Sequence, residues 1–85
     1  MQVSITKKAA KELDKIPDQI AGNITSRLSN LSLNPFPLNS KKLAGQNNYR
    51  LRTGVYRAIY TVDSKRKEIT ILRVAHRKTV YRGRI

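Results

Sequence analysis

The sequence predicts a two-layer α+β domain, in which an N-terminal helical hairpin packs on one face of a small antiparallel sheet in the order β-α-α-β-β-β. Two observations lead to this fold class. Apolar residues recur at helical spacing through residues 7–33, and they alternate with polar residues at a period of two through residues 49–77. A chain of 85 residues has room for one domain, which we place at residues 1–85.

The first third of the chain reads as a short strand followed by two helices. Residues 2–5 are expected to join the sheet at an edge. Thr6 is expected to cap the first helix, Pro17 to end it, and Asp18 to cap the second helix, which stops at Asn34 before a proline. Because the break between the helices is so short, they must run antiparallel. Their expected core positions are Ala9, Leu13, Ile16, Ile20, Ile24, Leu28 and Leu31.

The rest of the chain reads as a loop followed by three strands. Residues 35–46 contain proline, asparagine and glycine and are expected to be a loop. The strands are expected at 49–53, 55–62 and 69–77. Gly54 permits a tight turn between the first two of these strands, and residues 63–67 connect the second strand to the third. Strands joined by such short connections pair antiparallel.

The charge of the chain restricts its partners. Eighteen Lys and Arg against five acids give a net charge of +13, which favours a nucleic acid or an acidic protein as partner. From residue 43 onward, eleven cations face only two acids, Asp63 and Glu68. The absence of cysteine excludes disulfides and is typical of a cytoplasmic protein, and no apolar run is long enough to span a bilayer.

Strand periodicity also predicts which side chains face the core. Tyr56 and Tyr60 fall on the apolar parity and are expected to be buried. His76 shares its parity with Leu72 and Val74, so it is expected to point inward. Arg73 is open to two interpretations, as a phosphate contact or as the structural partner of Glu68 or Asp63.

Four segments in order resemble the RelE branch of the RelE/ParE toxin superfamily. They are KLAG at 42–45, YRLR at 49–52, VYRAIY at 55–60, and VAHR at 74–77 followed by Tyr81 and Arg82. The resemblance covers essentially the whole chain. It implies a toxin that enters the ribosomal A site, cleaves messenger RNA there, and is held inactive by a cognate antitoxin.

The resemblance also implies site residues. The active-site positions of the family fall on Arg50, Arg57, Arg77 and Tyr81, while Asn48 stands where the best-known members carry a cation and His76 where some members carry a lysine. Further contacts to RNA are expected from the remaining cations near these segments, which are Lys41, Lys42, Arg52, Arg73, Lys78 and Arg82.

These residue types suit RNA cleavage by the 2′-hydroxyl without a metal ion. The reaction requires a base, an acid and positive charge around the phosphorane. Arg57 and Arg77 are expected to clamp the phosphate, and His76 or Tyr81 to move the proton. No metal site or cofactor is expected, because the chain has one histidine, no cysteine and no paired carboxylates near these cations.

Two other functions compete with this prediction. One is a gyrase poison of the ParE branch, which shares the fold but lacks the arginine and tyrosine set. The other is an RNA-binding module without turnover, which would display aromatic residues between cations on an exposed sheet face. The presence of Arg50, Arg57, Arg77 and Tyr81 favours the nuclease, and the buried parity of the other tyrosines disfavours the module.

Overall fold

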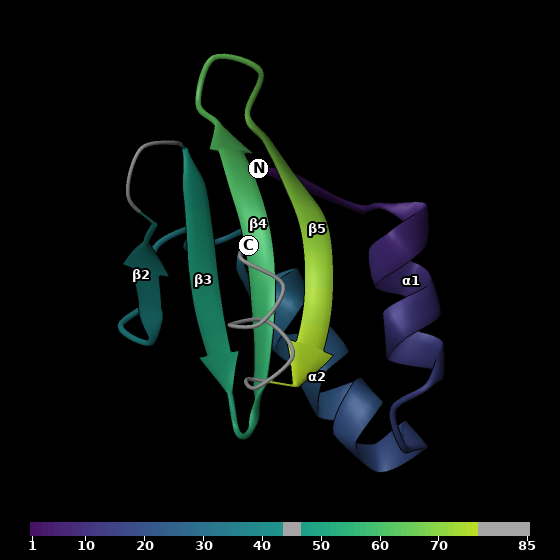
Figure 1. Ribbon diagram of the computed structural model, residues 1–85. Helices are drawn as coiled ribbons and strands as arrows, with labels where there is room; N and C mark the ends of the chain where they lie inside the picture. Colours follow the sequence, from purple (N-terminus) through teal and green to yellow (C-terminus); the bar gives the residue numbers. More distant parts are fainter. Residues whose placement is uncertain (44–46, 77–85) are drawn as a thin grey trace.

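The computed structural model describes residues 1–43 and 47–76. The elements follow the order β1 (Gln2–Ile5), α1 (Lys7–Asp14), α2 (Asp18–Asn30), β2 (Ser40–Lys42), β3 (Asn48–Thr53), β4 (Tyr56–Asp63) and β5 (Glu68–His76). The strands form one five-stranded sheet in the order β1-β5-β4-β3-β2 (Figure 1). No helix among the described residues is long and apolar enough to cross a membrane.

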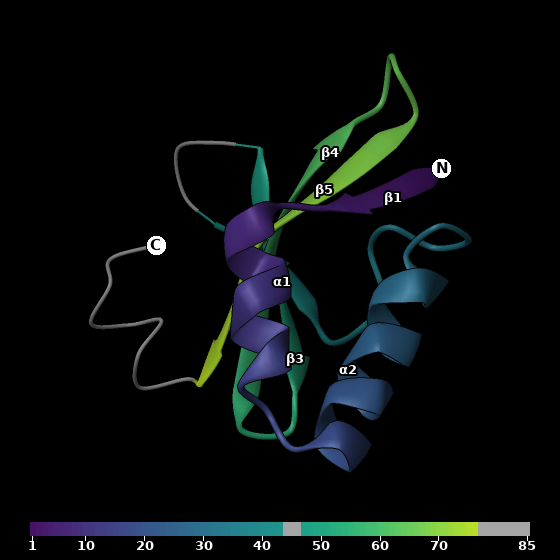
Figure 2. The ribbon, with the colours of Figure 1, turned by 90° about the vertical axis from the view of Figure 1, so that its right-hand side faces the viewer.

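The two helices lie on one side of the sheet and confirm the predicted α+β class. α2 lies behind the sheet in the view of Figure 1, α1 lies beside β5, and α2 turns back after α1 (Figure 2). The face of the sheet turned away from the helices is called the open face below. The Thr6 hydroxyl accepts a hydrogen bond from the Ala9 amide at 3.2 Å, as predicted for a cap. Asp18 was wrongly predicted to cap α2, because Pro17 holds that position and Asp18 is the first helical residue.

The sheet is mixed, because β1 does not follow the antiparallel pairing of the other strands. β1 lies at the edge, as expected, but runs parallel to β5 with Val3 opposite Ile69. A parallel pair needs a long crossover, and α1 and α2 lie within the chain that joins these two strands.

The predicted loop 35–46 contains an additional strand, β2. It pairs antiparallel with β3, placing Lys41 opposite Arg50, and Asn39 anchors its start. The Asn39 side-chain amide donates to the Arg52 carbonyl at 2.7 Å, and the Arg52 amide donates to the Asn39 carbonyl at 3.1 Å. The prediction missed β2 because three polar residues carry no apolar alternation, and a short lysine-bearing strand at an edge needs none.

The core lies between the helices and the sheet. Ile24 and Leu28 of α2 pack with Leu51, Val74 and Tyr60 in one cluster. Tyr60 is fully buried, as predicted, and its hydroxyl donates to the Pro35 carbonyl at 2.7 Å. The other large apolar members of the cluster are Ile16, Leu31, Val62, Ile69 and Ile71. Burying these side chains, at about 1.5–3 kcal/mol each, provides the main drive for folding.

The turns of the sheet form where they were predicted. Gly54 has a φ of 64°, in the region that glycine adopts without strain, and it links β3 to β4. In the β4–β5 turn, the Asp63 carboxylate accepts from the amides of Lys65 and Arg66 at 3.1 Å each. This pattern of side chain bonding to the backbone stabilises a tight turn.

A β-bulge interrupts the pairing of β4 with β5. Ile59 pairs with Arg73 and Tyr60 pairs with Ile71, so Leu72 is the extra residue. The bulge reverses the alternation of β5 after Ile71. Leu72 therefore packs with Ile59 outside the main cluster, whereas Val74 joins the main core.

Helix α1 takes over as the neighbour of β5 where β1 ends. The Thr6 amide donates to the Ile71 carbonyl at 3.0 Å, and the Thr6 hydroxyl donates to the Leu72 carbonyl at 3.1 Å. Further along, the Glu12 carboxylate accepts from the Val74 amide at 3.0 Å. These bonds satisfy backbone groups that would otherwise form an unpaired sheet edge.

Candidate functional site

Four cations from three adjacent strands lie on the open face, and we call them the basic cluster: Lys41, Arg50, Arg52 and Arg57. Arg50 and Arg52 alternate along β3 with the buried Leu51, which faces the helices. Lys41 of β2 pairs with Arg50, and Arg57 of β4 pairs with Arg52. The structure thus brings together these four of the predicted site residues.

Arg57 is held firmly within this cluster. Its side chain is only 3% exposed, and Nη1 donates to the carbonyls of Gly54 at 3.3 Å and Tyr56 at 3.1 Å. The buried Nε finds no acceptor among the described residues. A buried donor without an acceptor is costly, so an anion that reached this nitrogen would gain a strong, charge-assisted bond.

Strands β2 and β3 carry no acidic side chain among the cations of the basic cluster. All five acids of the chain lie in its described part, and Glu12 is bound to Arg73. The other four lie on the helices or at the β4–β5 turn, and they are Asp14, Asp18, Asp63 and Glu68. Because cations opposite one another across strands repel, this arrangement favours binding of an external anion.

His76 lies at the end of β5 on the helix side of the sheet. It pairs with Tyr56, and their rings meet edge to face at a centroid distance of 5.7 Å. The imidazole is half-buried, in keeping with the predicted inward orientation. The expected inward orientation was right for Val74 but wrong for Leu72, because the bulge shifts the alternation by one residue and puts Leu72 and Val74 on different faces.

Arg73 forms an ion pair with an acid that the sequence analysis did not consider. Its Nε and Nη2 donate to the Glu12 carboxylate at 2.8–3.0 Å, so the predicted partners Glu68 and Asp63 were wrong. Burial of Glu12 raises its pKa, but bonds from Arg73 and the Val74 amide outweigh that effect and leave the pKa below its usual value. Arg73 therefore has a structural role in the free protein.

The remaining predicted contacts divide into two groups. Lys42 is exposed but pairs with Tyr49, whose parity faces the helices, so it lies on the opposite side of β2 from Lys41. The others lie outside the described residues, and they are Arg77, Lys78, Tyr81 and Arg82. Within residues 1–43 and 47–76, no group of three or more His, Asp or Glu side chains is arranged to hold a metal ion.

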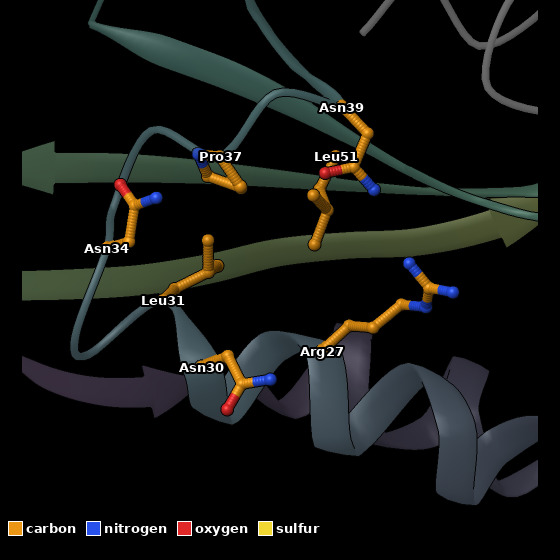
Figure 3. Close-up of a pocket in the computed structure, with 7 residues that line it drawn as sticks. All are labelled: Arg27, Asn30, Leu31, Asn34, Pro37, Asn39 and Leu51. Carbon is orange, nitrogen blue, oxygen red and sulfur yellow. The ribbon is translucent and has the colours of Figure 1, made fainter.

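A separate hollow of about 210 Å³ lies on the helix side, between α2 and the loop that leads to β2 (Figure 3). Leu31, Leu51 and Pro37 provide its apolar lining, and the Arg27 side chain extends along it. Three asparagines complete the lining, and they are Asn30, Asn34 and Asn39. The sequence carries no signal for this hollow, because its residues are brought together only by the fold.

Comparisons with known proteins agree with the fold. Residues 3–81 match the family described as the ParE toxin of the type II toxin–antitoxin system parDE. The chain is 33% identical to Toxin RelG of Mycobacterium tuberculosis, over 94% of each chain. It is 35% identical to Toxin RelE3 of Methanocaldococcus jannaschii, over 95% of this chain and 96% of the relative.

Among solved structures, the archaeal RelE–RelB complex from Pyrococcus horikoshii superposes with a TM-score of 0.80 at 33% identity, covering 89% of this chain and 93% of its counterpart. These likenesses extend over nearly the whole chain and include both the helices and the sheet. The chain therefore belongs to the RelE/ParE superfamily and is a RelE-type toxin of a type II toxin–antitoxin system.

Proposed function

We propose that this toxin is a metal-independent endoribonuclease that cuts messenger RNA in the A site of the ribosome and so stops translation. The observation that supports the proposal most strongly is the basic cluster, in which the buried Arg57 has a donor without an acceptor among the described residues. An arginine fork suits the oxygens of a phosphate, and its charge is retained when it is buried. A ribosomal target implies that the protein acts in the cytoplasm.

The reaction we propose is attack of the ribose 2′-oxygen on the adjacent phosphorus. The new P–O2′ bond forms as the P–O5′ bond breaks, leaving a 2′,3′-cyclic phosphate and a free 5′-hydroxyl. A base takes the proton of the 2′-hydroxyl, and an acid supplies one to the departing 5′-oxygen. His76 and Tyr81 are the candidates for these two proton transfers, and Arg57, Arg50 and Arg77 are the candidates for stabilising the negative charge on phosphorus.

The burial of Arg57 adds a condition to this mechanism. Arg57 is only 3% exposed in the free chain, so a phosphate reaches Nε only if the groups around the guanidinium move aside. Nη1 can meanwhile keep its bonds to the carbonyls of Gly54 and Tyr56, which hold the fork at the end of the β3–β4 hairpin. We therefore propose that RNA binding in the ribosome opens the site around an arginine that is already oriented.

An acidic antitoxin is the second proposed partner. The Pyrococcus horikoshii relative is a complex of RelE with RelB, and the charge of +13 on the present chain favours a negatively charged inhibitor. We expect the complex to be a toxin–antitoxin hetero-oligomer that prevents the toxin from cutting messages.

Inhibition of DNA gyrase is the alternative, because the matching family is described by its ParE members. The arginines of the basic cluster and the RelE-type relatives favour the nuclease instead. A supercoiling assay with purified gyrase decides between them, since only a gyrase poison would inhibit the enzyme directly.

Primer extension on messages bound to ribosomes tests the nuclease proposal. Wild-type toxin should produce discrete cuts within codons, each leaving a 2′,3′-cyclic phosphate. Arg57→Ala should lower the cleavage rate by about 100-fold or more, because removing one oriented donor to a developing anion has an effect of that size. Arg57→Lys should recover little of the wild-type cleavage rate, because lysine lacks the planar guanidinium group.

Arg66→Ala is the matched control for this experiment. Arg66 is an exposed arginine in the β4–β5 turn, at the opposite end of β4 from Arg57, so its loss should leave cleavage within a few-fold of wild type. Circular dichroism confirms that each variant folds. Undiminished cutting by a folded Arg57→Ala variant would refute the proposed role of Arg57, and uncut messages with the wild-type toxin would refute the nuclease itself.

A further inference from the structure

A groove runs along α2 on the helix side of the sheet, and we call it the α2 groove. It joins the hollow of Figure 3 to a second hollow of about 590 Å³, because Arg27 and Asn30 line both. The rest of the second hollow comes from α2 and from the end of β3, with Ile20, Asn23, Ser26, Thr53 and Gly54. Residues 20, 23, 27 and 30 follow at intervals of three or four, so they form one stripe along α2.

The α2 groove has the dimensions of a site for another helix. Its stripe on α2, from residue 20 to residue 30, spans about 15 Å at a rise of about 1.5 Å per residue, which is nearly three helical turns. At one end, the hollow of Figure 3 offers an apolar lining of Leu31, Leu51 and Pro37. An apolar side chain of a helix lying in the groove could enter this hollow.

Apolar side chains are also exposed at the other end of the groove. Ile20 was wrongly predicted to lie in the core, because it is 41% exposed and lines the second hollow, whereas Ile24 and Leu28 carry the buried face of α2. Val55, next to Gly54 in the β3–β4 turn, is 49% exposed. Exposed apolar residues gathered at a hollow favour a protein as partner.

The charge of the groove separates it from a surface that binds RNA. Arg27 is the only charged residue among the described residues that line either hollow. A nucleic-acid backbone is bound by several cations together, so one arginine between amides and apolar side chains does not suit it. A protein partner needs only a carboxylate placed opposite Arg27, and the net charge of +13 favours an acidic one.

The partner cannot enter the groove as an additional strand. β3 is bonded to β4 on one side and to β2 on the other. Beyond β2, Asn39 bonds to both the amide and the carbonyl of Arg52. Because these backbone groups are already paired, recognition must use side chains, as when an amphipathic helix lies in a groove.

We propose that the α2 groove binds an acidic amphipathic helix of the antitoxin, with an apolar side chain in the hollow of Figure 3 and a carboxylate paired with Arg27. This inference rests on the proposed antitoxin partner and assigns it a docking surface. The Arg27 side chain is exposed and extends along the hollow, where a carboxylate can reach it. The exposed Lys42 on the same side of β2 adds to the attraction. An anchor in an apolar pocket supplies affinity, and the charge at its border supplies specificity.

Reversing the charge of Arg27 tests the proposed ion pair, with the antitoxin encoded beside the toxin as the probe. Arg27→Glu and Arg66→Glu both replace an exposed arginine and change the net charge equally, but only Arg27 lines the groove. Isothermal titration calorimetry should show affinity reduced about tenfold or more by Arg27→Glu, because opposed like charges are costly, and within a few-fold of wild type for Arg66→Glu. Equal affinities for these two variants would overturn the inference.

Filling the groove tests the proposed anchor. Asn30 and Ser29 are neighbouring exposed residues of α2, and only Asn30 lines the hollows. Asn30→Trp should therefore block the groove and lower the affinity for the antitoxin about tenfold or more, whereas Ser29→Trp should not. Circular dichroism confirms that the variants fold. Tight binding of the antitoxin by a folded Asn30→Trp variant would overturn the inference.

Cleavage of ribosome-bound messages without antitoxin separates this inference from the nuclease proposal. Arg27→Glu should cut within a few-fold of the wild-type rate. Slower cutting with unchanged antitoxin affinity would overturn the inference and assign the groove to RNA. Loss of self-association instead, measured by sedimentation, would overturn it in favour of a second copy of the chain. If the antitoxin fails to bind wild-type toxin, the proposed partner is refuted together with the inference, and the nuclease proposal is unaffected.

Discussion

Replacing Glu12 by alanine should destabilise the domain more than replacing any other acid. The Glu12 carboxylate is the shared acceptor for the Arg73 guanidinium and for the Val74 amide, at distances of 2.8–3.0 Å. Without it, a largely buried guanidinium and a backbone amide lose their partner together. The same change also leaves the end of β5 without a neighbour at the position where α1 supports it.

The size of the effect follows from the burial of the pair. Removing one partner of a buried ion pair costs about 3–5 kcal/mol, and the side chains of Arg73 and Glu12 are 16% and 19% exposed, which admits some water. We therefore expect a loss of about 2–3 kcal/mol of unfolding free energy. For a domain of this size, that corresponds to a fall in Tm of about 10–20 °C. Glu12→Gln keeps an acceptor for the Val74 amide and should lose about half as much.

The contribution of Glu12 should depend on pH in a defined direction. Its pKa is lowered in the folded state, so the stabilisation is fully present above the pKa of the unfolded chain, about 4.3, and is lost as the pH falls through the lower folded value. The difference in stability between wild type and Glu12→Gln should thus be largest near neutral pH and should shrink below about pH 4.

Urea denaturation followed by circular dichroism measures these differences. Asp14→Ala is the control, because Asp14 is an exposed acid on the same helix and its loss should change the unfolding free energy by no more than about 0.5 kcal/mol. Equal midpoints for Glu12→Ala and Asp14→Ala would show that the contacts of Glu12 contribute nothing to stability.

Four further changes test the local structure by the same denaturation assay. Gly22→Ala should stabilise the domain by about 0.5–1 kcal/mol, because the added methyl group meets open space on α2. Gly54→Ala should destabilise the domain by about 1 kcal/mol, because a φ of 64° strains any residue other than glycine. Changes of the opposite sign in the unfolding free energy would refute these two predictions. Thr6→Ala should cost about 1–2 kcal/mol through loss of the helix cap and of the bond to β5, and an unchanged midpoint would exclude a capping role. Tyr60→Phe should cost about 1 kcal/mol by leaving the Pro35 carbonyl without its donor, and no cost would mean that water replaces the hydroxyl.

The sequence was sufficient to predict the helices and the three long strands, because their apolar residues repeat at the period of each structure. It could not reveal β2, since Ser40–Lys42 has no such pattern and pairs with β3 only through the fold. The pairing of Glu12 with Arg73 was also invisible, because 61 positions separate the two residues.

The candidate site was predictable in part. Alternation along β3 correctly placed Arg50 and Arg52 on the face opposite Leu51. The burial of Arg57 was not predicted, because an arginine in a strongly basic protein is expected at the surface. Lys41 and Lys42 were both predicted to contact RNA, and the structure places them on opposite faces of β2, because adjacent residues of a strand point in opposite directions.

The extra residue at Leu72 gives β5 one position at which the chain can lose a residue without changing the phase of the strand. Deleting Leu72 would close the bulge and leave Ile71 opposite Tyr60 and Arg73 opposite Ile59, so Val74 should stay in the core and Ala75 and His76 should keep their faces. A one-residue deletion elsewhere within β4 or β5 would instead turn the side chains beyond it to the other face of the sheet. An engineered chain without Leu72 should therefore fold with its strands in the same register, and it should lose only the contact between Leu72 and Ile59.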